Sequence, residues 1–139
     1  MKDLGITHLH LLPVYDYASV DETKSDKPQF NWGYDPENYN VPEGSYSTDP
    51  YNGAVRVSEM KQMVKTLHDN QISVIMDVVY NHVYNASDFC VNQIVPGYFS
   101  RVNEDGTYSN GSDCGNDTAS ERSMVRKYIV DLSLIHISE

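Results

Sequence analysis

The stretch Ile72-Ser-Val-Ile-Met-Asp-Val-Val79 is an almost continuous apolar run. Such a run is typical of a strand that is buried on both faces, as the strands of parallel sheets are. A second apolar segment, Ile6 to Leu12, also predicts a strand, and Pro13 ends it because proline has no N–H to donate. Two strands separated by a helical pattern predict a β-α-β unit, and hence an α/β fold.

Two helices are predicted. Apolar residues at helical spacing predict the first from Ser58 to Asp69, with Ser58 as its N-cap and Asn70 as a left-handed residue at its end. The second is predicted to begin near Thr118, because Thr118-Ala-Ser-Glu121 matches a capping box that precedes another apolar stripe.

Long segments without a helical or strand period follow both predicted strands, over residues 14–55 and 80–116. In the second, Asp105-Gly106 between short aromatic segments predicts a hairpin turn. Loops that leave the carboxyl ends of parallel strands are where α/β folds expose their active sites. We therefore look for functional residues in these two segments.

The composition narrows the class of partner. The 139 residues carry a formal charge of −10, which disfavours nucleic acid and anionic membranes as partners. No apolar run approaches the ~20 residues that span a bilayer, and the start lacks the pattern of a signal peptide, so the compartment stays unknown. The two cysteines, Cys90 and Cys114, could pair or stay free.

The segment Asp77-Val-Val-Tyr-Asn-His82 places polar groups at and just beyond the end of an apolar strand. The Asp77 carboxylate needs partners if it is buried, and His82 can hydrogen-bond a substrate hydroxyl. The alternative is structural: Asp77 caps a helix or pairs with an arginine, and His82 is a surface histidine.

The segment Asn31-Trp-Gly-Tyr-Asp-Pro36 brings aromatic rings and a carboxylate within a few residues. Gly33 permits a close backbone turn, which would present Trp32 and Tyr34 beside Asp35. Flat rings next to a carboxylate suit the apolar faces and hydroxyls of a sugar. The alternative is that these rings, Trp32 above all, fix the loop to the core.

Two metal-binding readings are weaker. His8 and His10 would project to one face of the first strand, but two packed, hydrogen-bonded histidines are the better interpretation. The acidic group around Asp113 and Asp117 could bind calcium, although a solvated loop is the simpler expectation.

Taken together, these motifs resemble the type I pullulanases, debranching members of the alpha-amylase family of glycoside hydrolases. The segment from Asp77 to His82 resembles the first conserved region of that family. The segment from Asn31 to Pro36, followed by Pro42-Glu-Gly-Ser-Tyr-Ser47, is similar to the pullulanase signature, and Cys114 to Glu121 resembles the loop that comes next. The resemblance extends to about Asp131.

The resemblance implies a partial (β/α)₈ barrel, from about the second strand to the third helix, with long loops at the carboxyl ends of the strands. Residues 6–12 would be its second strand, 72–79 its third, and 120–132 the start of its third helix. The chain would be an incomplete catalytic barrel over residues 1–139, and residues 132–139 would be a non-native tail, since they do not continue the family pattern.

The resemblance also implies substrate-binding residues for an α-glucan, namely Tyr34, Asp35, Asp77, Asn81, His82, Asn116 and Asp117. Tyr34 would stack on the sugar that precedes the scissile bond, with Asp35 in the same network, while His82 donates to that sugar and Asp77 supports an arginine. Asn81 would brace the loop, at a position where some alpha-amylases bind calcium; no cofactor is otherwise implied. Asn116 and Asp117 would lie on the rim of the cleft.

The implied activity is retaining hydrolysis of α-1,6 linkages in pullulan, glycogen or branched dextrins. Its two catalytic carboxylates belong to strands beyond this chain, so no catalytic residue is assigned and the chain alone is expected to be inactive, and aggregation-prone or only partly ordered. Two alternatives stay open: an α-1,4-acting hydrolase of the same family, and a non-catalytic glucan-binding module.

Overall fold

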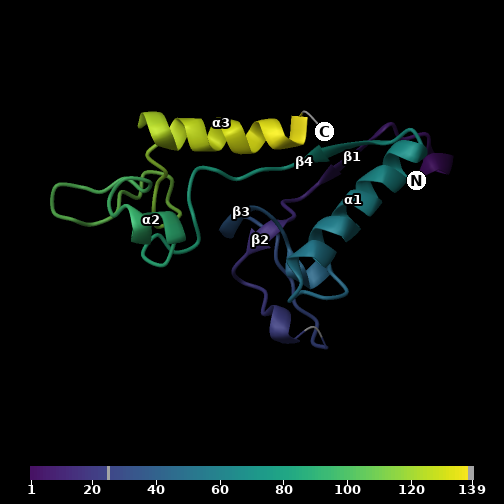
Figure 1. Ribbon diagram of the computed structural model, residues 1–139, viewed down its shortest axis with the longest axis horizontal. Helices are drawn as coiled ribbons and strands as arrows, with labels where there is room; N and C mark the ends of the chain where they lie inside the picture. Colours follow the sequence, from purple (N-terminus) through teal and green to yellow (C-terminus); the bar gives the residue numbers. More distant parts are fainter. Residues whose placement is uncertain (25, 138–139) are drawn as a thin grey trace. The chain divides into compact units, whose positions relative to one another are not determined.

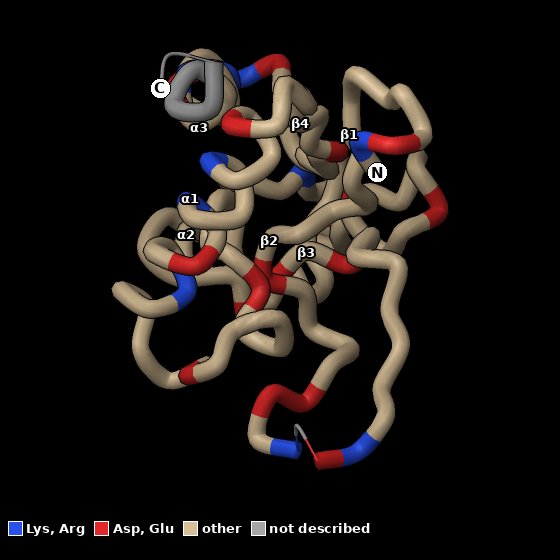
Figure 2. Tube along the Cα trace, turned by 90° about the vertical axis from the view of Figure 1, so that its right-hand side faces the viewer, with Lys and Arg blue, Asp and Glu red and all other residues tan. Residues whose placement is uncertain are grey.

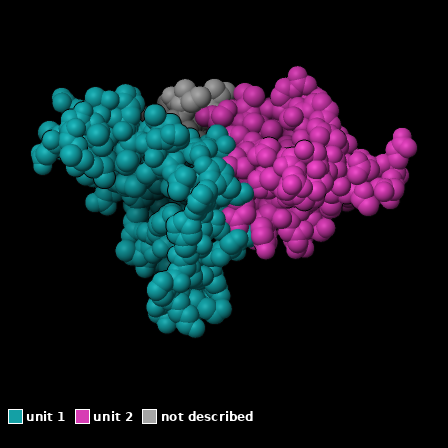
Figure 3. Space-filling view, turned by 180° about the vertical axis from the view of Figure 1, so that it is seen from behind, with its two compact units in different colours: residues 1–34, 40–78 teal, residues 35–39, 79–139 magenta. Residues whose placement is uncertain are grey.

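The computed structural model describes residues 1–24 and 26–137 of the chain. The chain forms two compact units, which Figure 3 shows in different colours. Unit 1 comprises residues 1–34 and 40–78, and unit 2 comprises residues 35–39 and 79–139. Each unit is described by itself below.

Unit 1 contains the predicted β-α-β unit. Strands β1 (His8–Leu11) and β4 (Ser73–Met76) pair in parallel, with His8 opposite Ser73 and Leu11 opposite Met76. Helix α1 (Gly53–Asp69) precedes β4 along the chain (Figure 1). Both predicted strands and the helix between them are confirmed, and with them the α/β class.

The burial of these elements differs from the prediction. Along both β1 and β4 exposed residues alternate with half-buried ones, and α1 has no buried residue among its 17, all of which the structure describes. The expectation that the second strand is buried on both faces is therefore wrong for this chain. In the described residues the two strands pair only with each other, and a two-stranded sheet cannot cover its own faces.

The ends of α1 also differ from the prediction. Asn52, not Ser58, is the N-cap, since its side-chain oxygen accepts a hydrogen bond from the Ala54 N–H at 3.1 Å. At the other end the left-handed residue is Gln71, with φ 63°, whereas Asn70 has φ −98°. A cap earlier in the chain adds more than a turn of helix, and the sharp change of direction into β4 falls one residue later than expected.

The segment 14–55 contains structure that the sequence pattern did not predict. Strand β2 (Tyr15–Tyr17) pairs with β3 (Pro36–Pro42), whose first four residues belong to unit 2. Short 3₁₀ helices lie at η1 (Lys2–Leu4), η2 (Glu22–Lys24) and η3 (Gly44–Tyr46). Acidic and basic residues alternate along the loop around η2 (Figure 2).

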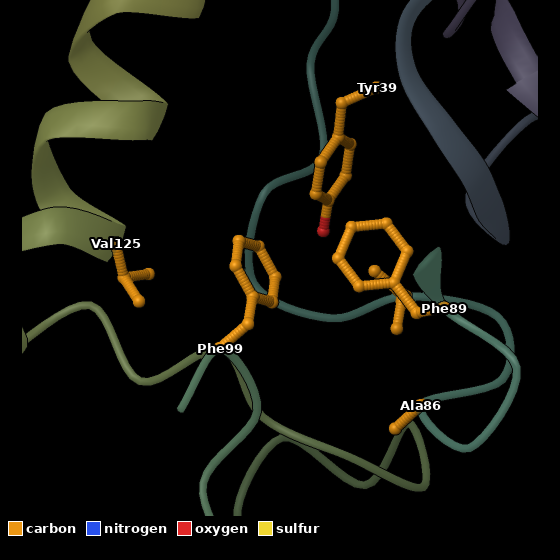
Figure 4. Close-up of a cluster of buried hydrophobic side chains, with 6 residues drawn as sticks. Tyr39, Ala86, Phe89, Phe99 and Val125 are labelled. Atoms are coloured by element: carbon orange, nitrogen blue, oxygen red, sulfur yellow. The ribbon is translucent and has the colours of Figure 1, made fainter. Parts of the chain in front are cut away.

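Unit 2 holds a cluster of buried apolar side chains (Figure 4). Its rings meet at close range: the centroids of Phe89 and Phe99 are 4.9 Å apart, and the Tyr39 ring lies 5.9 Å from that of Phe89. The Tyr128 ring packs edge-on to Phe99, with the ring centroids 5.6 Å apart. The core cluster, as we call it below, consists of Tyr39, Val83, Ala86, Phe89, Phe99 and Val125.

Two helices and a hairpin complete unit 2: α2 (Cys90–Ile94), which was not predicted, and α3 (Ser123–Ile137). The predicted hairpin turn is confirmed, because Val102 and Tyr108 form an antiparallel bridge and Gly106 has φ 86°. The predicted tail continues α3 through residue 137, and residues 138–139 lie outside the described residues.

The predicted capping box at the start of α3 is wrong. Thr118 is buried and forms an antiparallel bridge with Ser100, so it belongs to the loop and not to the helix. The Glu121 carboxylate accepts hydrogen bonds from the Arg101 guanidinium at 2.7 and 3.2 Å instead of capping. Arg101 binds the Glu121 side chain that the motif needs, the backbone of Thr118 lies in the bridge, and the helix begins later, at Ser123.

Two remaining observations concern the surface. Cys90 and Cys114 are free and exposed, so the open question about their pairing is settled for this structure. In the part of the chain that the structure describes, no helix combines the length and apolar character that crossing a membrane requires.

Candidate functional site

The turn at residues 31–34 has the geometry that its sequence predicts. Gly33 has φ 85°, and a Cβ atom there would lie 2.4 Å from the Pro13 carbonyl oxygen, so only glycine fits. The Asn31 side-chain oxygen accepts the Gly33 N–H at 2.7 Å and closes the turn. Trp32 and Tyr34 are 61% and 41% exposed on either side of it, so the alternative that Trp32 anchors the loop in the core is wrong.

Tyr34 and Asp77 are 43 residues apart, and unit 1 brings them together. The Tyr34 hydroxyl donates a hydrogen bond to Asp77 Oδ2 at 2.6 Å. This bond raises the pKa of the Tyr34 phenol, because the hydroxyl proton is held by the carboxylate. Asp77 directly follows β4, so the strand end and the aromatic turn form one polar-aromatic site, which we call the Tyr34–Asp77 pair.

His82 lies in unit 2, in the loop that follows β4. Its side chain is only 6% exposed, so the alternative of a surface histidine is wrong. Its backbone carbonyl accepts a hydrogen bond from the Tyr39 hydroxyl, and the carbonyl of the exposed Asn81 accepts the Thr118 N–H at 2.9 Å. Tyr39, in the middle of β3, is a site-supporting residue that the sequence analysis missed.

Asn116 and Asp117 are buried, and both bind the chain's own loops. The Asn116 side chain accepts the Val83 N–H at 3.0 Å and donates to the Val83 carbonyl at 2.6 Å. The resemblance implies that Asn116 and Asp117 lie on the rim of a cleft. In the structure both side chains are buried inside unit 2.

The partners of Asp117 are hydrogen-bond donors. Its carboxylate accepts from the Ser109 hydroxyl at 2.6 Å and from the Gly111 and Ser112 N–H groups at 2.7 and 3.0 Å. These donors hold the pKa of Asp117 far below its usual range. Since the carboxylate faces donors, Asp117 does not fit the calcium reading, and neighbouring Asp113 is exposed on the surface.

The seven predicted residues therefore divide between the units. Tyr34 and Asp77 meet in unit 1, while the other five, Asp35, Asn81, His82, Asn116 and Asp117, belong to unit 2. Asp35 is half-buried at the first residue of that unit. That Tyr34 and His82 converge on one sugar stays a prediction.

The two strand histidines are not packed. His8 and His10 are both exposed on β1, although His8 Nδ1 hydrogen-bonds the Thr7 hydroxyl at 2.8 Å. The expectation of packed histidines is wrong because the face of β1 on which they lie is open to solvent.

Unit 1 also contains an acidic cluster that the sequence pattern did not reveal. Carboxylate oxygens of Asp16, Glu22 and Glu43 lie within 4.8 Å of one another. Arg56 supplies the compensating charge, with one guanidinium nitrogen 3.3 Å from Asp16 and another bonded to Glu22. Burial raises the pKa of Glu43, against the effect of the N–H groups it accepts.

The chain matches a known family and its solved structures. Residues 1–95 match the family described as alpha amylase, catalytic domain. Pullulanase of Bacillus subtilis is 48% identical over 139 residues, covering 100% of this chain and 19% of its own length. Pullulanase 1, chloroplastic, of Arabidopsis thaliana is 37% identical, covering 94% of this chain and 17% of its own length.

Two solved structures extend this likeness to the fold. Pullulanase from Paenibacillus barengoltzii in complex with maltohexaose and alpha-cyclodextrin is 56% identical, with a TM-score of 0.90 over 94% of this chain and 21% of its own. Type I pullulanase from Bacillus subtilis complexed with maltose is 51% identical, with a TM-score of 0.87 over 94% of this chain and 18% of its own. The chain thus spans about a fifth or less of the curated relatives it matches.

Proposed function

Because this chain belongs to the alpha-amylase catalytic-domain family, we propose that it is part of a glycoside hydrolase that cleaves α-1,6-glucosidic linkages in pullulan, glycogen or branched dextrins. The observation that carries the proposal is the Tyr34–Asp77 pair, in which an exposed ring is oriented by a carboxylate at a strand end. Similarity to pullulanases, including a structure bound to maltohexaose, favours an α-glucan as the substrate.

The roles of the residues follow from their chemistry. The Tyr34 ring offers a flat face to the C–H face of a glucose unit, and its bond to Asp77 limits rotation of the phenol. His82 would donate a hydrogen bond to the same glucose unit, with Asp35 in that network. A ring whose rotation is limited before the substrate arrives lowers the entropy cost of binding.

The hydrolysis we propose is of the retaining type, which needs two carboxyl groups about 5–5.5 Å apart on either side of the scissile bond. Carboxylates of the acidic cluster approach one another this closely. Arg56 binds two of them, and both Glu43 oxygens accept backbone N–H groups, from Tyr17 and Ser45. We therefore assign no catalytic residue here, and propose that the chain alone does not hydrolyse pullulan.

The open edges of the β1–β4 pair support a place in a larger sheet. We propose that β1 and β4 are the second and third strands of a (β/α)₈ barrel and that α3 is its third helix. On this proposal, the exposed faces of β1, β4 and α1 are covered by the rest of the barrel.

A hybrid enzyme tests the function directly. In it, this chain replaces the matched residues of the Bacillus subtilis pullulanase, and release of maltotriose from pullulan is measured. We expect hydrolysis of pullulan and a loss of about 10²-fold in kcat/KM for Tyr34→Ala. The control is Tyr51→Ala, since Tyr51 is a more exposed tyrosine of the same unit, outside the Tyr34–Asp77 pair. A hybrid that cleaves amylose but leaves the α-1,6 bonds of pullulan intact would favour the α-1,4-acting alternative.

The glucan-binding alternative is tested on the 139-residue chain itself. Calorimetry with maltohexaose is expected to give no measurable heat of binding, because the chain holds only part of a sugar site. Micromolar binding by the chain would favour a non-catalytic module instead.

A further inference from the structure

The backbone of residues 81–84 is hydrogen-bonded at every residue, although the segment is neither helix nor strand. The donors and acceptors come from two separate segments of unit 2, residues 36–39 and 116–118. The Asn81 carbonyl accepts a hydrogen bond from the Thr118 N–H, and the His82 carbonyl accepts one from the Tyr39 hydroxyl. The Asn116 side chain bonds both the N–H and the carbonyl of Val83. The Tyr84 N–H donates to the Pro36 carbonyl.

We propose that Tyr39 and Asn116 are positioning residues that hold this backbone segment so that the His82 imidazole is aimed at the substrate. The inference rests on the function proposed above and assigns Asn116 a role inside the protein instead of contact with substrate. Neither residue is expected to touch the glucan, because Asn116 is 3% exposed and Tyr39 is 6% exposed.

The chemistry of Asn116 suits this role. A carboxamide offers one acceptor and one donor on the same planar group, and Val83 presents a matching N–H and carbonyl. An aspartate in this place keeps the acceptor but sets a negative oxygen against the Val83 carbonyl. The isosteric change Asn116→Asp therefore replaces one of the two hydrogen bonds with repulsion between two oxygens, and the volume of the side chain stays nearly the same.

The role of Tyr39 follows from where its ring lies. The ring packs against Tyr80, Phe89 and Phe99 of unit 2, and Figure 4 shows its hydroxyl leaving the ring inside the core cluster. A hydroxyl on a ring that is fixed by packing is a rigid anchor for the His82 carbonyl. Small displacements matter at such a place, since a misplacement of about 1 Å can cost about 10²-fold in rate.

Unit 2 supplies matched controls. Asn92 is a second buried asparagine, 5% exposed, and it donates to the Ala86 carbonyl at 2.8 Å and accepts the Ser100 N–H at 3.1 Å. It has the same kind of bonding as Asn116, but its hydrogen bonds go to Ala86 and Ser100 and not to residues 81–84. Tyr128 serves in the same way for Tyr39, because it packs against Tyr39 and Phe99 in the same unit.

The experiment compares Asn116→Asp with Asn92→Asp, and Tyr39→Phe with Tyr128→Phe, in the hybrid enzyme. At equal loss of Tm, we expect kcat/KM for pullulan to fall about 10-fold or more for Asn116→Asp and about 3-fold for Tyr39→Phe, with most of the loss in kcat. The controls are expected to stay within about 2-fold of the parent. Equal losses in kcat/KM within each pair would overturn the inference, because they would show a role in stability only.

A second measurement does not depend on activity. Hydrogen–deuterium exchange of the peptide covering residues 81–84 is followed in the hybrid and in the 139-residue chain. Exchange is expected to rise at least 10-fold in Asn116→Asp and to stay near the parent value in Asn92→Asp. Unchanged exchange in Asn116→Asp would refute the positioning role even if the hybrid is active. An inactive parent hybrid would refute the proposed function and leave the positioning role to be judged by exchange.

Discussion

The β-α-β part of unit 1 and the loops of unit 2 differ in how order relates to burial. In unit 1, β1, β4 and α1 are regular, yet none of their residues, all of which the structure describes, is buried. In unit 2, the core cluster is built largely from loop residues and is closed by rings in mutual contact. The backbone bonds of a helix or of a strand pair need at most one partner segment, whereas burial needs partners on every side, and in this chain it is the loops that supply them.

The largest test of this difference removes a ring from the core cluster. Phe99 is 2% exposed, so Phe99→Ala is expected to lower the free energy of unfolding of unit 2 by about 3–5 kcal/mol through the cavity it leaves. Amide exchange in unit 2, read residue by residue, measures the loss. Ile75→Ala in β4, where the side chain is 44% exposed, is the control and is expected to cost about 1 kcal/mol or less. Similar costs at the two positions would contradict the comparison.

A second test uses the two buried carboxylates, one in each unit, whose pKa values shift in opposite directions. For Asp117 the donors outweigh burial and the pKa is lowered, so the carboxylate stabilises the fold above its unfolded pKa of about 4 and loses that effect as the pH falls through its folded value. For Glu43 burial outweighs the donors and the pKa is raised, so its stabilising effect is present below its unfolded pKa and is lost as the pH rises.

We therefore expect opposite pH profiles for the two amide variants. Asp117→Asn should destabilise unit 2 by about 2 kcal/mol at neutral pH, and the difference from the parent should shrink below about pH 4. Glu43→Gln should be close to the parent below about pH 4 and should become more stable than the parent as the pH rises, because only the parent then carries a buried charge. Urea unfolding at a series of pH values measures both. If the stability difference from the parent changes with pH in the same direction for both variants, the two carboxylates do not have oppositely shifted pKa values.

A smaller effect is expected at the Tyr34–Asp77 pair. Asp77→Asn should return the raised pKa of the Tyr34 phenol toward the ordinary value of about 10, because the charged acceptor is gone. A pH titration followed by NMR of ring-labelled tyrosine measures the change, with the exposed Tyr51 as reference. A Tyr34 signal that titrates identically in both proteins would mean that the hydrogen bond does not form in solution.

The smallest effect is expected at the turn between α1 and β4. Gln71 has φ 63°, which is strained for a residue with a Cβ atom, so Gln71→Gly should stabilise unit 1 by roughly 0.5–1 kcal/mol. Asn70→Gly, one residue earlier at φ −98°, should give no such gain. Thermal unfolding of the two variants measures the difference. A higher Tm for Asn70→Gly would contradict the assignment of the strain to Gln71.

Local chemistry made several features predictable. The glycine of the aromatic turn, the hairpin glycine and the two parallel strands were expected from residue type and apolar period, and the structure has all of them. The capping box failed for a physical reason: Thr118 lies in a backbone bridge with Ser100, and the Arg101 guanidinium binds the Glu121 carboxylate, in each case about twenty residues away along the chain. The sequence of a short motif does not show which distant residues will bind its side chains or pair with its backbone in the folded chain.

The candidate site shows the same division. Tyr34 and Asp77 were identified from two separate motifs, but only folding brings the phenol to 2.6 Å from the carboxylate. Tyr39 was missed because an isolated tyrosine in a turn-rich segment has no pattern that distinguishes an anchor from a surface ring. The Asn116 side chain, which was expected at a rim, is buried in the structure and bonds both polar groups of Val83.

The amino-acid sequence by itself determined the α/β class, the positions of β1 and β4, the turn at Gly33 and the family to which the chain belongs. These depend on residue type, on period and on φ preferences, which are properties of near neighbours along the chain. Only the tertiary structure decided which side chains are buried, which carboxylate is held by donors and which by an arginine, and what holds the His82 backbone. Those outcomes depend on desolvation and on contacts between residues far apart in the chain, which no short segment specifies.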